Sequence, residues 1–179
     1  MRQSQLQYTF KHFSELTTLE FYTLAKLRVD VFVVEQECIY PEFDGYDANA
    51  STVHVQAINS TGELVAYARL LYGDLKQEGK QECSTQSSND KTVRIGRVIV
   101  AAQCRGAGLA RELMEEIIAV LQRQDVSAIE LSAQTYVVPF YESLGFAVQS
   151  DEYLEDGIAH KDMRFIQDPS LSSQLQQSD

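Results

Sequence analysis

The stretch "VRIGRVIVAAQCRGAGLARELMEEIIAVL", Val93–Leu121, passes from an apolar, β-branched segment through two closely spaced glycines into an amphipathic pattern. The first part is typical of a buried strand. After the glycines, apolar residues recur at helical spacing. The sequence therefore predicts a strand over Val93–Val100 and a helix over Gly106–Arg123, with Gly106 and Gly108 at the junction.

Elements on both sides of this junction complete an α/β pattern. An edge strand is expected over Tyr8–Phe13, and a helix of about four turns begins at Thr17 or Thr18. Phe21, Leu24, Leu27, Val31 and Val34 form its apolar stripe. Further strands are predicted over residues 53–58, 62–72, 128–134 and 161–166, with a short helix closed by Gly145 before the chain re-enters the sheet at Phe146. This order predicts an α/β sheet, mixed rather than fully parallel, with helices on both faces.

Composition limits the class of protein. A chain of 179 residues suits one domain, which we assign to residues 1–166. The polar segment 73–92 reads as a flexible loop and the tail 167–179 as disordered. With no long apolar run and no leader pattern, neither a membrane span nor a secretory signal is predicted. Three cysteines without ligand spacing predict no disulfide framework and no metal site, which fits a cytoplasmic protein.

The net charge of −11 argues against nucleic-acid binding, which needs a basic face. A cleft edged by carboxylates would attract a cationic or amine substrate, although the charge also simply aids solubility.

The glycine junction has the chemistry of an anion site. Small residues let the backbone approach a ligand, and the first N–H groups of a helix carry the positive end of its dipole. Arg105 and Arg111 flank the glycines and can add charge. The spacing fits neither a phosphate-binding P-loop nor a dinucleotide fingerprint. A tight turn that binds nothing is the alternative.

Gln103, Gly106 and Gly108 after the "VIV" strand resemble the acetyl-CoA motif of the GCN5-related N-acetyltransferases (GNAT). A second motif of that family follows downstream as "PFYESLGF", Pro139–Phe146. The resemblance covers roughly Val53–Phe165. The segments "LRVDVFVVEQECIYPEFDGYDANASTVH" and "EDGIAHKDMRF" are similar to the ElaA-like branch of the family.

The resemblance implies a single-domain GNAT-like fold in which two neighbouring parallel strands splay apart to form the acetyl-CoA cleft. The pantetheine arm would pair with the first strand and the pyrophosphate would lie on the amides of the turn. The implied cofactor-binding residues are Val98, Ile99, Val100, Arg105, Gly106, Ala107, Gly108, Leu109, Ala110 and Arg111. The N–H of Val100 would stabilise the oxyanion.

Acetyl transfer to an amine also needs a proton donor for the departing thiolate and a base for the amine. The family places the donor at Tyr141, whose alternative role is that of a core or pocket-lining residue. For the base, His160 and Glu35 are candidates beside a chain of waters, with His54 less favoured. Asp44 and Gln36 are predicted to bind the acceptor, although Asp44 and Asp47 can equally cap turns, which is the favoured role for Asp47.

Three arginines in the apolar elements need partners. We expect Arg28, Arg69 and Arg97 to form ion pairs that hold the loop 40–49 against the sheet. Cys38 and Cys104 suggest an acyl-cysteine intermediate, but neither has a base nearby in the sequence.

The predicted function is transfer of the acetyl group of acetyl-CoA to a primary amine of a small molecule or peptide, by direct attack in a ternary complex. Two alternatives stay open. "RVDVFVVEQ" with "EFDGYD" also resembles the acyl-homoserine-lactone synthases. The other alternative is a module that binds CoA without turnover. The acceptor is undetermined, and a monomer or a homodimer is expected.

Overall fold

The computed structural model describes residues 6–38, 40–73, 91–124 and 126–166. The chain divides into two compact units, Met1–Leu131 and Ser132–Asp179, and each is considered by itself. The first contains β1 (Gln7–His12), η1 (Phe13–Glu15), α1 (Thr18–Arg28), η2 (Val29–Glu35), β2 (Thr52–Ile58), β3 (Leu64–Tyr72), β4 (Thr92–Val100), η3 (Ala102–Cys104), α2 (Leu109–Arg123) and the first four residues of β5 (Ala128–Gln134). None of the described helices is both long and apolar enough to cross a membrane.

The sheet of the first unit has the strand order β1-β2-β3-β4-β5. The first three pairings are antiparallel, and β4 pairs with β5 in parallel. The predicted strands and the mixed sheet are thereby confirmed, with β1 at the edge. Parallel pairing joins Thr92–Ile95 to Ala128–Leu131, so the last five residues of β4 lie beyond this register.

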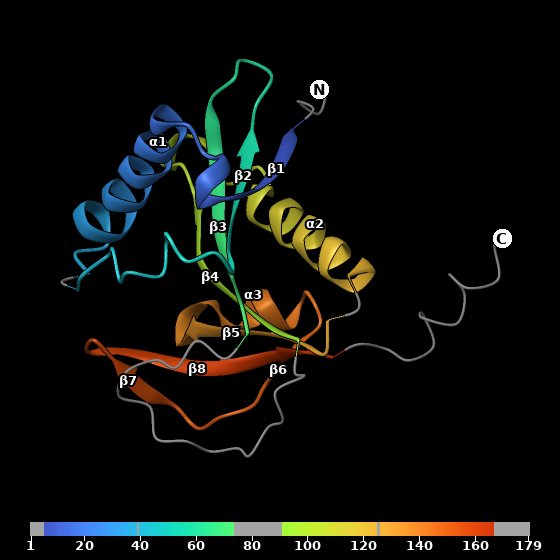
Figure 1. Cartoon of the computed structure of the whole chain (residues 1–179). Helices are drawn as coiled ribbons and strands as arrows, with labels where there is room; N and C mark the ends of the chain where they lie inside the picture. The colour runs from blue at the N-terminus through green and yellow to red at the C-terminus, as the bar shows by residue number, and fades with distance from the viewer. Residues whose placement is uncertain (1–5, 39, 74–90, 125, 167–179) are drawn as a thin grey trace, which may run out of the picture. The chain divides into compact units, whose positions relative to one another are not determined.

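Helices α1 and α2 lie on opposite sides of strands β2, β3 and β4 (Figure 1). The buried side of α2 packs against β3 and β4 through its apolar stripe of Leu113, Met114, Ile117, Ile118 and Leu121. α2 begins at Leu109, three residues later than predicted. Gly106 and Gly108 have φ angles of +78° and +85°, and this left-handed backbone cannot belong to the helix.

The first helix begins at the predicted place because of a capping box. The Thr17 hydroxyl accepts the Glu20 N–H at 3.2 Å, and the Glu20 carboxylate accepts the Thr17 N–H at 2.8 Å. After Arg28 the chain widens into the π-helix η2, which ends at Glu35 as expected for the end of the helical segment.

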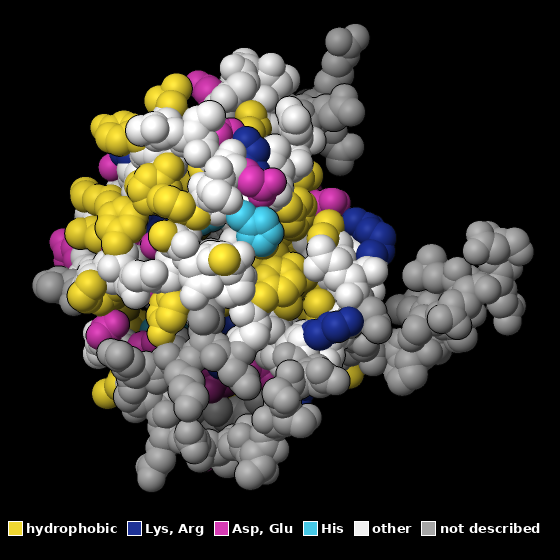
Figure 2. All heavy atoms as spheres, in the orientation of Figure 1, with side chains coloured by type: hydrophobic (Ala, Val, Ile, Leu, Met, Phe, Trp, Pro, Cys, Tyr) yellow, Lys and Arg dark blue, Asp and Glu magenta, His cyan; other side chains and the backbone are white. Residues whose placement is uncertain are grey.

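The π-helix rotates the apolar stripe of the segment. Leu24 and Val31 are buried, as predicted, and pack in one cluster with Tyr67 and Ile99, but Val34 is 69% exposed. Each π turn takes up an extra residue, so a position chosen by α-helical spacing faces solvent. Figure 2 shows hydrophobic side chains gathered on the surface over α1 and the segment that follows it.

The second unit contains the rest of β5 and then η4 (Thr135–Val137), α3 (Val138–Glu142), β6 (Phe146–Val148), β7 (Tyr153–Glu155) and β8 (Ile158–Phe165). β8 pairs with both β6 and β7 in antiparallel fashion. The short helix and the re-entry at Phe146 are confirmed. The sequence missed β7 and placed the start of β8 three residues late. Most of the predicted flexible loop 73–92, residues 74–90, lies outside the described residues, and Thr92 at its end belongs to β4. The tail 167–179, expected to be disordered, also lies outside the described residues.

Candidate functional site

The turn before α2 has the geometry of an anion site. In the described part of the chain, the first amides of this helix to find a backbone acceptor are those of Arg111 and Glu112, which donate to Gly108 O at 2.9 and 3.1 Å. Arg105 donates its amide to Ala102 O at 3.4 Å. The intervening N–H groups of residues 106–110 make no such bond among the described residues. They can therefore bind an oxyanion.

The space above this turn suits a close ligand. A Cβ built on Gly106 or Gly108 would meet no atom within 4 Å. The residues present therefore fit a phosphate group held by backbone amides. Arg105 and Arg111 flank the turn in the sequence, and Arg111 contacts Glu115 at 3.5 Å.

Val100 presents its peptide groups away from β3. Ala101 donates to Val65 O at 2.9 Å, which makes Val100 and Ala66 a non-hydrogen-bonded pair of the antiparallel ladder. Both the N–H and the C=O of Val100 consequently point toward the other edge of β4. The carbonyl accepts a hydrogen bond from Arg105 Nε at 3.1 Å, and the N–H faces the same edge, as an oxyanion donor would require.

Arg105, in the turn, forms an ion pair with Glu35, another predicted site residue. Its guanidinium makes a two-point contact with this carboxylate, through Nη1 to Oε1 and through Nη2 to Oε2 at 2.9 Å. The hydrogen bond from Arg105 lowers the pKa of Glu35. Sequence reasoning missed this pair because the two residues are 70 positions apart and no local pattern links them. Gln36 follows Glu35 and is exposed, and its carbonyl accepts from Cys38 Sγ at 3.7 Å.

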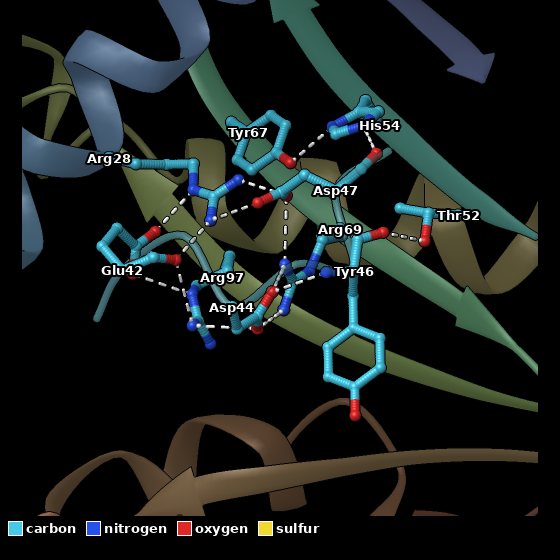
Figure 3. A network of polar contacts seen from close by, with 10 residues as sticks. All are labelled: Arg28, Glu42, Asp44, Tyr46, Asp47, Thr52, His54, Tyr67, Arg69 and Arg97. Atoms are coloured by element: carbon cyan, nitrogen blue, oxygen red, sulfur yellow. Dashed lines mark hydrogen bonds and ion pairs between the residues drawn. The ribbon is translucent and has the colours of Figure 1, made fainter. Parts of the chain in front are cut away.

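A network of arginines and carboxylates holds the loop 40–49 against the sheet, as predicted (Figure 3). Arg28 is fully buried and donates to Glu42 Oε1 at 2.5 Å and to Asp47 Oδ1 at 2.6 Å. Arg69 joins Asp47 to Asp44 at 3.0 and 2.5 Å. Three positive charges thus meet three negative charges once Arg97 is included, and the network is neutral as a whole.

Asp47 has a different role from the turn cap that the sequence favoured, and Asp44 makes the turn contact that the sequence left open as an alternative. Among the described residues, the Asp47 carboxylate accepts hydrogen bonds from arginines and does not cap a turn: Oδ1 accepts from Arg28 and Arg69, and Oδ2 accepts from Arg28. It is Asp44 that caps a turn, by accepting the Tyr46 N–H at 3.1 Å. Burial alone would raise the pKa of each carboxyl, but the hydrogen bonds and charges of the arginines outweigh burial and lower it.

Asp44 also contacts Arg69 and Arg97, and its side chain is 26% exposed. Its charge is therefore matched within the protein, which leaves less of it for a cationic acceptor. The role of Asp44 in binding the acceptor stays a prediction.

Arg97 connects this network to β4. Its Nε donates to Glu42 Oε2 at 2.9 Å, and its guanidinium lies over the ring of Tyr40. Arg97 has a φ of +54° and sits where the register of β3 with β4 shifts. A bulge with left-handed backbone thus directly precedes the Val98–Val100 segment.

His54 belongs to the buried network and not to an exposed site. Its ring lies between Tyr67 Oη at 2.8 Å and Asp47 O at 3.0 Å. Burial lowers its pKa, so the ring is neutral near pH 7. The sequence did not identify Tyr67 as its partner.

In the second unit, Tyr141 and His160 have separate surroundings. Tyr141 is buried between Phe140 and Phe146, and burial raises its pKa to about 12. His160 stacks on Tyr153 with ring centroids 6.2 Å apart, and its Nδ1 contacts Ile158 O at 2.9 Å.

A cluster of oxygens that the sequence did not single out lies next to His160. Ser132 Oγ is 2.6 Å from both Tyr153 Oη and Asp162 Oδ1, and Tyr153 donates to the same carboxylate oxygen at 2.8 Å. These hydrogen bonds connect Tyr153 of β7 and Asp162 of β8 to Ser132.

Comparison with known proteins shows the family of the chain. Residues 33–166 match the acetyltransferase (GNAT) domain family. A UPF0039 protein of Schizosaccharomyces pombe is 40% identical over 90% of this chain and 97% of its own length. Protein ElaA of Escherichia coli is 37% identical over 83% of this chain and 89% of its own.

Solved structures show the same likeness. The crystal structure of Escherichia coli ElaA superposes with a TM-score of 0.76 at 33% identity, covering 90% of this chain and all of that one. An acyl-CoA N-acyltransferase from Pseudomonas aeruginosa gives a TM-score of 0.75 at 39% identity, with the same coverage. The homoserine-lactone synthase LasI shares the fold alone, at a TM-score of 0.70 and 17% identity. The chain is thus a GNAT acyltransferase, and its relatives within that family include ElaA.

Proposed function

We propose that this protein transfers the acetyl group of acetyl-CoA to a primary amine in a ternary complex. The observation that carries the proposal is the row of backbone N–H groups over residues 106–110 at the start of α2. These groups suit the pyrophosphate of CoA, and family membership makes an acyl-CoA the expected donor.

The end of β4 provides a hydrogen-bond donor for the thioester. Val100 turns its N–H toward the edge of β4 that β3 does not use. A donor in that direction can hydrogen-bond the thioester oxygen as it gains negative charge. Backbone of Val98–Val100 would pair with the pantetheine arm, while Arg105 and Arg111 add charge near the phosphates.

The transfer itself needs one bond made and one broken. The neutral amine nitrogen attacks the thioester carbon, the C–N bond forms, and collapse of the tetrahedral intermediate breaks the C–S bond. The thiolate takes a proton, for which we propose Tyr141, because its buried phenol is neutral at physiological pH. The amine loses a proton to a base, for which Glu35, His160 and water are the candidates.

Calorimetric titration tests the proposal. The purified protein should bind about one acetyl-CoA per chain, and addition of amines should release free CoA thiol. A clear preference for a long-chain acyl-CoA would instead support chemistry like that of the lactone synthases. Binding of acetyl-CoA without thiol release for any amine would point to a CoA-binding module, and no binding at all would refute the proposal.

A further inference from the structure

The Glu35–Arg105 pair spans two parts of the first unit with different proposed tasks. Glu35, a candidate base for the acceptor amine, ends η2, and Arg105 directly precedes Gly106 in the turn proposed to hold phosphate. Arg105 Nε is fixed to Val100 O at 3.1 Å, so only the two terminal nitrogens face Glu35.

The pair is placed where it can exchange partners. The side chains of Arg105 and Glu35 are 40% and 43% exposed, and an ion pair at such exposure contributes little free energy. A phosphate on the amides of residues 106–110 would lie beside the same guanidinium. Arginine binds phosphate through the same two-point geometry that it uses for carboxylates, and a pyrophosphate carries more charge.

Building on the proposed function, we propose that Glu35 and the pyrophosphate of CoA compete for Arg105, so that cofactor binding releases the Glu35 carboxylate to bind the ammonium group of the acceptor. Arg105 stays at the turn through its bond to Val100 while its terminal nitrogens change partner. Glu35 then presents an uncompensated negative charge at the end of η2. The acceptor class is accordingly a primary amine that arrives as a cation after the cofactor and gives one proton to the base before its neutral nitrogen attacks the thioester.

The proposed competition predicts whether a Glu35 variant binds CoA more tightly or more weakly. Replacing Glu35 by glutamine removes the competitor, so the loss of this carboxylate should tighten CoA binding. A role in holding the structure together would predict weaker binding or no change. The expected gain is about two- to fivefold, the size of an exposed ion pair.

The experiment is calorimetric titration of three proteins with CoA and with pantetheine, which lacks phosphates. The proteins are the wild type, Glu35→Gln and the control Asp30→Asn. Asp30 lies on the same π-helix and forms its own exposed pair with Lys26, so the control removes an equal charge. Glu35→Gln should bind CoA more tightly with no gain for pantetheine, and Asp30→Asn should match the wild type.

Either of two results would overturn the inference alone: unchanged or weaker CoA binding by Glu35→Gln, or an equal gain for pantetheine. Failure of the wild type to bind CoA would remove the proposed function and the inference together. The two failures are therefore distinguishable.

Discussion

Arg28 and Asp47 form an ion pair at 2.6 Å in which the arginine side chain has no exposed surface and the aspartate side chain only 9%. Burial of a charge is costly, and each partner offsets the cost for the other. Glu42 adds a second carboxylate at 2.5 Å from Arg28. Arg28, the last residue of α1, therefore contacts two of the three buried or half-buried carboxylates of the loop 40–49, and Arg69 and Arg97 contact the same group of carboxylates.

Replacing Arg28 by methionine should lower the free energy of unfolding by about 3–5 kcal/mol, because Glu42 and Asp47 would be buried without this partner. Urea denaturation measures the change. Lys11→Met is the control, since the Lys11–Glu20 pair is about one-third exposed on each side and should be worth less than about 1 kcal/mol. Similar losses of unfolding free energy for the two variants would show that the buried ion pair stabilises the fold no more than the exposed one.

Residue types and spacing were enough to predict the strands other than β7, the first helix and the ion pairs of Arg28, Arg69 and Arg97. Each depends on local periodicity or on the rule that a buried charge needs a partner. The π-helix over Val29–Glu35 was missed because its apolar residues follow α-helical spacing closely enough to hide the extra residue per turn.

The glycine turn was recognisable from its motif, but the contacts around it were not. The Glu35–Arg105 pair joins residues 70 positions apart, and Arg97, which has left-handed backbone, contacts Glu42 across 55 positions. β7 has only three residues and relies on β8 for its pairing, so its sequence alone carries little strand signal.

Stability should fall in two phases as the pH is lowered. The pKa of buried His54 is lowered from 6.5, so below that pH the unfolded chain takes up a proton that the folded protein refuses, and stability decreases. The lowered pKa values of Asp44 and Asp47 act further down. Their contribution is present above the unfolded value of 3.8 and is lost as the pH falls through the folded values.

Urea denaturation between neutral and acid pH separates these phases. The variant His54→Gln should lose the part of the slope that begins near pH 6.5 and keep the acid phase. Parallel curves for the variant and the wild type would show that His54 is not the group responsible.

Alanine at Gly108 should damage cofactor binding more than folding. Gly108 and Gly62 have φ angles of +85° and +84°, and neither has an atom within 4 Å of an added Cβ. Each Gly→Ala change should therefore cost a similar amount of stability, about 1 kcal/mol. Only Gly108→Ala places a methyl group where the pyrophosphate would approach.

Titration with acetyl-CoA compares the two variants. Gly108→Ala should bind at least about tenfold more weakly than the wild type, a change of about 1.4 kcal/mol, whereas Gly62→Ala should bind normally. Normal binding by a folded Gly108→Ala protein would mean that the cofactor does not use this turn.

Removing the hydroxyl group of Tyr141 should slow the reaction without weakening cofactor binding. A proton donor contributes about a hundredfold or more to the rate, so Tyr141→Phe should lower kcat by about that factor. Because burial raises the pKa of Tyr141 to about 12, the wild-type rate should show no loss from ionisation of this phenol up to about pH 10.

Tyr136→Phe is the matched control, since that tyrosine is 71% exposed and lies on the preceding turn η4. Thiol release from acetyl-CoA in the presence of an accepted amine gives kcat for all three proteins, and calorimetry gives their cofactor affinities. An unchanged kcat in Tyr141→Phe would assign the tyrosine to packing between Phe140 and Phe146, and the thiolate would then take its proton from another source.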